Sequence, residues 1–158
     1  GAAVVDDTQI VAWAQANAPI KLEAVAEFSG PGATVGTNWK NGIDLAVAEI
    51  NGCNYCLSAH TYLGKNLAKL DDAEIAANRS GASNDIKADA AVRFAAKVTQ
   101  QRGKVSSEDV AAVKAAGYSE AQVIEIVQHV ALNTWTNYIN EVAGTEIDFP
   151  VVQARLAA

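Results

Sequence analysis

The near absence of helix breakers is the feature that most constrains this chain. Its three prolines are Pro19, Pro31 and Pro150, so the long stretch between the second and the third contains none. Alanine recurs through this stretch and β-branched runs are short. Alanine has the highest helix propensity, whereas a proline inside a helix costs about 3 kcal/mol. The sequence therefore predicts an all-α fold in which glycines and N-cap residues mark the helix ends.

Apolar periodicity and breakers divide the chain into helices. Ile43, Val47 and Ile50 share one face of a helix, which we expect to be largely buried. A length of 158 residues suits one domain, so we expect a single domain over residues 1–158, with a leader and loop at 1–37 and a core at 38–150. The predicted elements are helices at 8–17 and 22–28, a loop at 29–36, helices at 38–50, 53–70, 71–78 and 107–116, one from residue 86 that Gly103 ends, and a last one capped by Ser119.

Charge and hydropathy exclude several classes of partner. The formal net charge is -6 and the isoelectric point is near 4.8, so attraction to nucleic acid or to anionic lipid is not expected. No stretch approaches the roughly 18 consecutive apolar residues of a spanning helix. We therefore expect a cytoplasmic protein that binds neither nucleic acid nor membranes. Two cysteines are too few for a disulfide-stapled scaffold, which points to a chemical purpose for them.

The candidate site is the segment Cys53-Asn54-Tyr55-Cys56 with His60 one helical turn further on. Gly52 suits the left-handed conformation that closes a helix, so the cysteines are expected at the start of a new one. Residues three and four apart share a helix face, which places Cys53, Cys56 and His60 on one stripe. A helix N-terminus and a nearby imidazole lower a cysteine pKa and favour the reactive thiolate. A second thiol can then trap a sulfenic acid as a disulfide. This pattern favours thiol–disulfide chemistry.

Other interpretations of the same residues remain open at this stage. A Cys-x2-Cys-x3-His pattern can donate three ligands to zinc, but the remaining histidine, His129, lies far away in sequence. The cysteines can also be plain buried thiols or a static disulfide, which adds little stability across so short a loop. His60 can be a core histidine bonded to a backbone carbonyl. For Tyr55, packing is favoured over contact with substrate.

The last helix combines apolar residues around much of its circumference with a polar stripe. Such a helix is normally central or at a subunit interface. His129, Asn133 and Asn137 follow one another at four-residue steps, and buried polar groups need partners, so we expect this stripe to hydrogen-bond at a helix or subunit interface. The tryptophans are expected to be core or interface anchors; they are Trp13, Trp39 and Trp135.

The chain resembles a known family at two places. Asn51-Gly52-Cys53-Asn54-Tyr55-Cys56 with Ala59-His60 looks like the signature of the AhpD-like alkylhydroperoxidases of the carboxymuconolactone decarboxylase superfamily. The C-terminal half is similar to the peroxidase-related branch, and the resemblance covers about residues 38–150. The segments that carry it are Gly117-Tyr118-Ser119, Glu125-Ile126-Val127, Val130-Ala131-Leu132-Asn133, Thr136-Asn137 and the run from Val142 to Pro150.

This resemblance implies an AhpD-like antiparallel helical bundle that assembles into homo-oligomers. It implies a peroxidase that reduces alkyl hydroperoxides or hydrogen peroxide through a Cys53/Cys56 dithiol–disulfide cycle assisted by His60. An external dithiol would be the reductant, with no metal and no organic cofactor. We assign Cys56 as the attacking thiol because it is the four-residue neighbour of His60, with Cys53 resolving, although the reverse order stays open. Lactone decarboxylation is weaker, since that branch does not rely on such a cysteine pair.

The sequence departs from the family pattern at one position. The family has a glutamate twelve residues before the first cysteine, thought to complete a proton relay through the histidine, and this chain has Asn41 there. An amide cannot accept a proton or stabilise an imidazolium as a carboxylate does. Asp44, on nearly the same helix face, is the candidate substitute, whereas Glu49 points elsewhere on the helix. The alternative function is a redox-sensing or stress-response binding protein with little turnover.

Overall fold

The computed structural model describes residues 37–155 and shows helices without strands in that range. This confirms the predicted fold class, an all-α helical bundle. The helices and loop expected between residues 8 and 36 lie outside the described residues, as do Trp13 and the Trp39 side chain. The described helices are α3 (Thr37–Asn51), α4 (Asn54–Asn66), α5 (Asp72–Arg79), α6 (Ile86–Gln101), α7 (Ser107–Ala115) and α8 (Glu120–Ala143).

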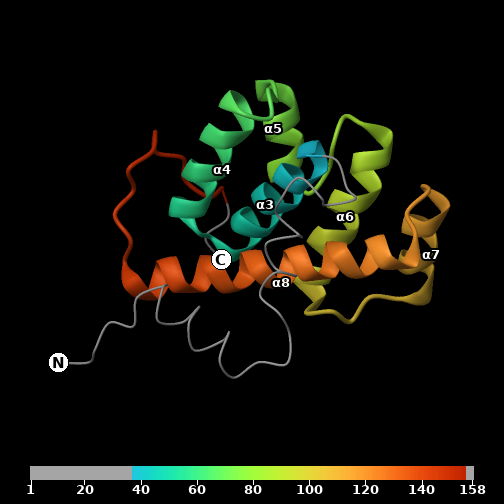
Figure 1. The fold of residues 1–158 in the computed structure, drawn as a ribbon. Coiled ribbons are helices and arrows are strands. Elements are labelled where there is room, and N and C mark those ends of the chain that lie inside the picture. Colours follow the sequence, from blue (N-terminus) through green and yellow to red (C-terminus); the bar gives the residue numbers. More distant parts are fainter. Residues whose placement is uncertain (1–36, 156–158) are drawn as a thin grey trace, which may run out of the picture. The chain divides into compact units, whose positions relative to one another are not determined.

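Helix α3 is the centre of this arrangement. It contacts α4, α5, α6 and α8, and Figure 1 shows α8 running beneath it along the length of the bundle. Gly42 permits one close approach, since a Cβ atom there would lie 2.7 Å from Cγ2 of Val92 on α6. The expectation of a largely buried helix is confirmed, with Ile43 and Val47 fully buried and Ile50 partly so.

The apolar side chains form two clusters that meet at α3. The larger joins α3 to α6, α7 and α8 through residues such as Val47, Phe94 and Ile126. The smaller joins α3, α4 and α5, and it contains Cys53 and Cys56. The two cysteines are therefore part of the packed interior of the fold.

Most helix ends lie within a residue or two of their predicted positions, because the caps are local. Asp71 caps α5, and Ser119 forms a capping box at the start of α8. The prediction that the helix after the cysteines runs to about Leu70 is wrong, since α4 ends at Asn66. Lys69 adopts a left-handed conformation with φ of 58°, and the N–H of Leu70 bonds back to the carbonyl of Gly64 at 3.0 Å. A non-glycine residue at positive φ leaves little trace in a sequence.

Helix α8 buries several polar side chains and exposes several large apolar ones. Its inward face carries buried Glu125, His129, Asn133 and Asn137, whereas Trp135 and other large apolar side chains are exposed on its outer face. Trp135 is half exposed, so it is not a core anchor of this chain. The exposed apolar residues of this face, called here the outer α8 face, are Ile124, Val127, Trp135, Tyr138, Ile139 and Val142.

The chain after α8 returns along α4 as an extended segment, residues 149–155, which we call the C-terminal strap (Figure 1). Val152 and Ala154 donate their backbone N–H groups to Ser58 Oγ and Asn54 Oδ1, both at 2.9 Å. Both strap residues also pack against the cluster that contains the cysteines. The strap thus covers one side of the cysteine-bearing helix.

Buried Glu49 holds the end of this strap. Its Oε1 accepts the backbone N–H of Arg155 at 2.6 Å, and its Oε2 pairs with Nε of Arg79 at 2.6 Å. Arg79 in turn donates to the carbonyl of Gln153 at 2.7 Å. Glu49 therefore faces α5 and the strap, whereas the helix wheel predicted only that it points elsewhere than Asn41 and Asp44.

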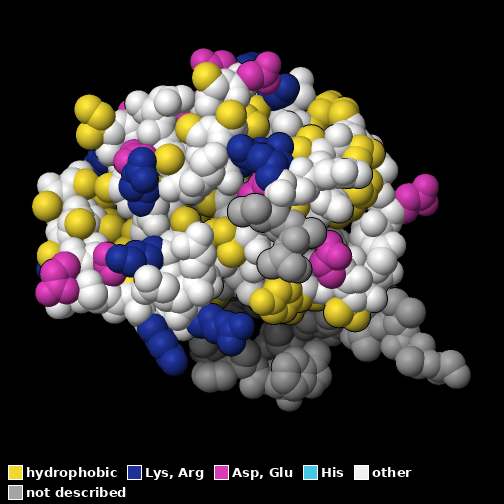
Figure 2. Space-filling model, turned by 180° about the vertical axis from the view of Figure 1, so that it is seen from behind, with side chains coloured by type: hydrophobic (Ala, Val, Ile, Leu, Met, Phe, Trp, Pro, Cys, Tyr) yellow, Lys and Arg dark blue, Asp and Glu magenta, His cyan; other side chains and the backbone are white. Residues whose placement is uncertain are grey.

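Charges on the face drawn in Figure 2 are mixed, with Lys and Arg side chains lying among Asp, Glu and apolar ones. Within residues 37–155, none of the helices has the length and apolar character needed to cross a membrane.

Replacing Glu49 with alanine tests the role of the buried ion pair. The change leaves Arg79 and the strap without their anion, so we expect the free energy of unfolding to fall by about 3 kcal/mol. Urea denaturation followed by circular dichroism measures this. The matched control is Glu146→Ala at an exposed site, which should change stability by less than about 0.5 kcal/mol. Equal effects from the two variants would contradict the anchoring role.

Candidate active site

The junction between α3 and α4 places the two cysteines. Gly52 has φ of 73°, and its N–H bonds to the carbonyl of Glu49 at 3.2 Å. The N–H of Cys53 bonds to the carbonyl of Ala48 at 3.0 Å. These two bonds form a Schellman motif, which ends α3 and requires the left-handed conformation that glycine adopts readily. Cys53 is consequently held at a defined position between the helices.

Cys53 is also the N-cap of α4. Its Sγ accepts the backbone N–H of Cys56 at 3.3 Å. The two Sγ atoms lie 2.6 Å apart, with the Cys53 thiol donating to Cys56, and both cysteines are free thiols here. A disulfide bond measures about 2.05 Å, so closure needs only a small movement. The structure therefore brings the predicted thiol pair together at the start of a helix.

The two thiols have opposite acid strengths. The hydrogen bond from Cys53 lowers the pKa of Cys56 to about 6, against the opposing effect of burial. The hydrogen bond from Asn140, the nearby amide of Asn137 and the charge of His60 lower this pKa further. The pKa of Cys53 is raised far above its ordinary value, first by its hydrogen bond to Cys56 and then by burial. The arrangement therefore favours the thiolate on Cys56 and the protonated thiol on Cys53.

Access differs between the two sulfurs. Cys53 is fully buried and Cys56 retains 4% of its exposure. The side chain of His60 is 23% exposed. The exposed part of the site therefore lies at His60 and, to a small extent, at Cys56.

His60 has a carboxylate beside it. Its Nδ1 lies 3.6 Å from Oδ2 of Asp44, and Oδ1 of Asp44 accepts the side-chain amide of Asn133 at 2.6 Å. Asn133 on α8 thus holds the carboxylate of α3 toward the imidazole of α4. The geometry is that of a carboxylate–imidazole pair, in which the carboxylate orients the ring.

The other candidate relay residue is not part of this pair. Asn41 is half-buried on α3, and within residues 37–155 no hydrogen bond links its side chain to His60. The structure therefore brings Asp44, and not Asn41, to the histidine.

The polar stripe of α8 faces this site. Asn133 bonds to Asp44, and Oδ1 of Asn137 accepts the side-chain amide of Asn51 at 2.9 Å. The prediction that the stripe hydrogen-bonds at a helix interface is confirmed for these two residues. Burial lowers the pKa of the third member, His129, below its ordinary value.

Asn140 is a site residue that was not predicted from the sequence. Its Nδ2 donates to Sγ of Cys56 at 3.3 Å, although the two residues are 84 positions apart. Asn140 lies three residues after Asn137 and so continues the same helix face. That three-residue step was the available signal, because an asparagine in an otherwise apolar helix needs a partner.

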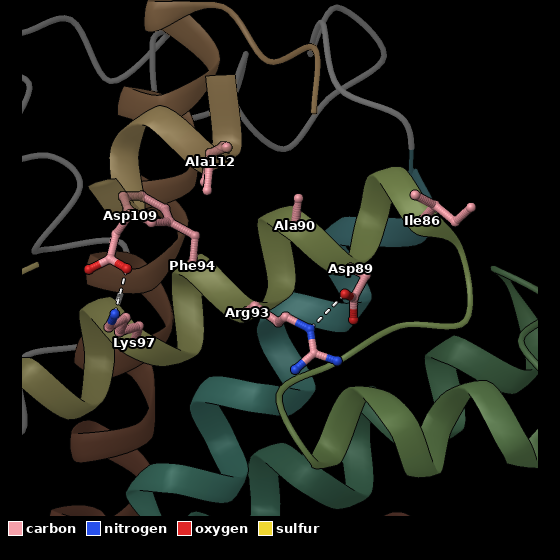
Figure 3. Close-up of a pocket in the computed structure, with 9 residues that line it drawn as sticks. Ile86, Asp89, Ala90, Arg93, Phe94, Lys97, Asp109 and Ala112 are labelled. Atoms are coloured by element: carbon pink, nitrogen blue, oxygen red, sulfur yellow. Dashed lines mark hydrogen bonds and ion pairs between the residues drawn. The ribbon is translucent and has the colours of Figure 1, made fainter. Parts of the chain in front are cut away.

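Two other kinds of site are a metal site and a ligand pocket. No cluster of three or more His, Cys, Asp or Glu residues suited to a metal ion occurs among the residues described. A hollow of about 450 Å³ lies between α6 and α7 (Figure 3), where Arg93 pairs with Asp89 and Lys97 with Asp109. Its lining includes no residue of the segment from Cys53 to His60. Since its charges are paired within the chain, it lacks the convergent free polar groups of a typical ligand site.

Alkylation with iodoacetamide tests the assigned acidities. Only the thiolate reacts, so the rate at Cys56 should rise with pH around a midpoint near 6, while Cys53 stays unmodified well above neutral pH. Replacing Cys53 with alanine removes the largest cause of the lowered pKa, and the midpoint should move to higher pH. Peptide mass spectrometry identifies the modified residue. Preferential labelling of Cys53 would reverse the assignment.

Comparison with known proteins supports the fold. No protein-family model and no curated protein matches the sequence. Among solved structures, the chain is similar to one described as an uncharacterized peroxidase-related protein from Silicibacter sp. TM1040. The TM-score is 0.67 at 17% sequence identity, over 92% of this chain and 84% of that chain. At this identity the likeness establishes a common fold and nothing finer.

Proposed function

We propose that this protein is a thiol-dependent peroxidase, similar to the AhpD-like alkylhydroperoxidases, that reduces alkyl hydroperoxides or hydrogen peroxide. The observation that carries the proposal is the pair of sulfurs 2.6 Å apart at the start of α4, where the hydrogen bond from Cys53 lowers the pKa of Cys56. The sequence resemblance and the fold shared with a peroxidase-related protein support the same reaction class.

The proposed reaction needs only Cys53, Cys56, His60 and a dithiol reductant from another molecule. The Cys56 thiolate attacks the terminal oxygen of the hydroperoxide, an S–O bond forms and the O–O bond breaks. The alkoxide that leaves takes a proton from the His60 imidazolium, which Asp44 stabilises. Cys53 then attacks the Cys56 sulfenic acid, and the resulting disulfide releases water. A dithiol supplied by another molecule restores both thiols by thiol–disulfide exchange.

The differences in exposure and pKa between the two cysteines favour Cys56 as the attacking residue. It retains some exposure and has the lower pKa, whereas Cys53 is sealed and lies within bonding reach of it. A resolving cysteine needs to meet only its partner, so full burial does not hinder that role. Rapid resolution also protects Cys56 from irreversible oxidation.

Peroxide consumption coupled to a dithiol reductant tests this proposal. We expect the reduced protein to consume tert-butyl hydroperoxide faster than free cysteine does at the same pH. Cys56→Ser should abolish the reaction, and Cys53→Ser should leave a single turnover that ends in a sulfenic acid detectable by mass spectrometry. A wild-type rate no greater than that of free thiol would rule the proposal out.

The relay residues give a second test. Asp44→Asn removes the carboxylate beside His60, so we expect kcat to fall by about tenfold or more, within the range typical of proton-transfer groups. Asn41→Glu restores the carboxylate of the family pattern and should raise kcat. The matched control is Asp72→Asn at an exposed site, which should leave kcat unchanged. An unaltered rate in both site variants would show that proton transfer through His60 does not limit turnover.

The second candidate function is a redox sensor with little turnover. Asn41 at the family's glutamate position and the near-complete burial of both sulfurs favour it, because both slow a catalytic cycle. A sensor forms its disulfide reversibly in a defined redox buffer but shows no steady-state peroxide consumption. Thiol titration together with the turnover assay separates the two functions.

A second copy of the chain is the partner proposed for the outer α8 face. Soluble monomers rarely expose a large continuous apolar patch, and the family resemblance implies homo-oligomers. Sedimentation velocity should give a mass above that of one chain, and Tyr138→Glu should reduce it. The control is Glu141→Gln on the same helix, and a monomeric wild type would contradict this assembly.

A further inference from the structure

Asn137 has an unusual hydrogen-bonding position. Its side chain is fully buried, and its Oδ1 accepts the amide of Asn51 at 2.9 Å. Its Nδ2 is one of the few buried side-chain atoms that make no hydrogen bond in the described part of the chain. Leaving a buried donor unsatisfied costs about 1–3 kcal/mol, so such a group calls for an explanation.

The donor is oriented toward the thiol pair. Asn140, on the same face of α8, donates to Sγ of Cys56 at 3.3 Å, and the Asn137 amide also lowers the pKa of Cys56. A carbonyl oxygen turned toward a thiolate would be repelled, which favours the orientation in which Asn51 binds Oδ1 and leaves Nδ2 facing the sulfur. Two amide N–H groups from α8 therefore converge on Cys56.

We propose that Asn137 is a catalytic residue that donates a hydrogen bond to the leaving oxygen of the peroxide, and that Asn140 is a positioning residue that holds the Cys56 sulfur for attack. The inference rests on the proposed peroxidase function and adds to it the group that receives the developing negative charge.

The chemistry of the step calls for such a donor. As the Cys56 sulfur bonds to the terminal oxygen, the O–O bond breaks and the electron pair moves to the alkoxide oxygen, which His60 protonates. A fixed donor in a buried site stabilises this charge without reorganisation, and removing one donor of this kind typically costs about 100-fold or more in rate. Asn51 fixes the Asn137 amide before the peroxide binds.

The test compares two electrophiles on the reduced, full-length protein. Iodoacetamide reports only the reactivity of the Cys56 thiolate, whereas tert-butyl hydroperoxide needs stabilisation of a leaving oxygen as well. Both rate constants are measured at pH 8.5, where Cys56 is ionised. For Asn137→Ala we expect the ratio of the peroxide rate to the alkylation rate to fall about 100-fold. For Asn140→Ala we expect the alkylation midpoint to move to higher pH, with the ratio at full ionisation nearly unchanged.

Two further variants control for packing. Asn51→Ala breaks the same α3–α8 hydrogen bond but keeps the Asn137 donor, so its ratio should fall by about threefold at most. Asn137→Leu keeps the side chain neutral and close to its volume but lacks the donor, so its ratio should fall as in Asn137→Ala. This second variant keeps the test decisive if the alanine variant does not fold.

The outcomes separate this inference from the proposed function. If wild-type protein reacts with peroxide and the ratio is unchanged in Asn137→Leu, the role of Asn137 is overturned while the peroxidase remains. If the ratio falls equally in Asn51→Ala, Asn137 acts through packing alone. If wild-type protein is alkylated rapidly but reduces peroxide no faster than free cysteine, both proposals are overturned.

Discussion

The hydrogen bonds of Cys53 join two helices and two thiols at a single residue. Its backbone N–H closes α3, its sulfur caps α4, and its thiol proton is directed at Cys56. The left-handed Gly52 ends α3, and the N-cap position of Cys53 in the first turn of α4 brings its sulfur to that of Cys56. The lowered pKa of Cys56 is thus a consequence of how α4 begins.

Helix α8 contributes polar side chains to the site formed at the α3–α4 junction. The carboxylate beside His60 is held by Asn133, and the sulfur of Cys56 receives the amide of Asn140. A helix that buries amides and exposes Trp135 and Val142 gives up apolar burial on its inner face. The buried amides instead form hydrogen bonds that link α3, α4 and α8 around the thiols, and a satisfied polar network of this kind favours one arrangement of the side chains.

The C-terminal strap explains why a reactive thiol pair can lie in a packed interior. Val152 and Ala154 lie over the cysteine cluster, and Glu49 and Arg79 hold the segment in place. The strap adds to the burial of this cluster, whereas His60 stays partly exposed. A thiolate stabilised by amides and a nearby imidazole tolerates such burial, whereas desolvation alone would raise its pKa.

The sequence by itself determined the helical fold, most helix ends and the meeting of Cys53 and Cys56 at the start of a helix, because propensity, capping and the helical repeat act over a few residues. It also indicated Asp44 as a substitute for Asn41, since both lie on one helix. Only the tertiary structure decided that Asn140 contacts Cys56 from 84 residues away, that the asparagines of α8 face inward while Trp135 is exposed, and that α4 ends at Asn66. Those features depend on how helices distant in sequence pack together, and on a left-handed lysine, for which local patterns carry little signal.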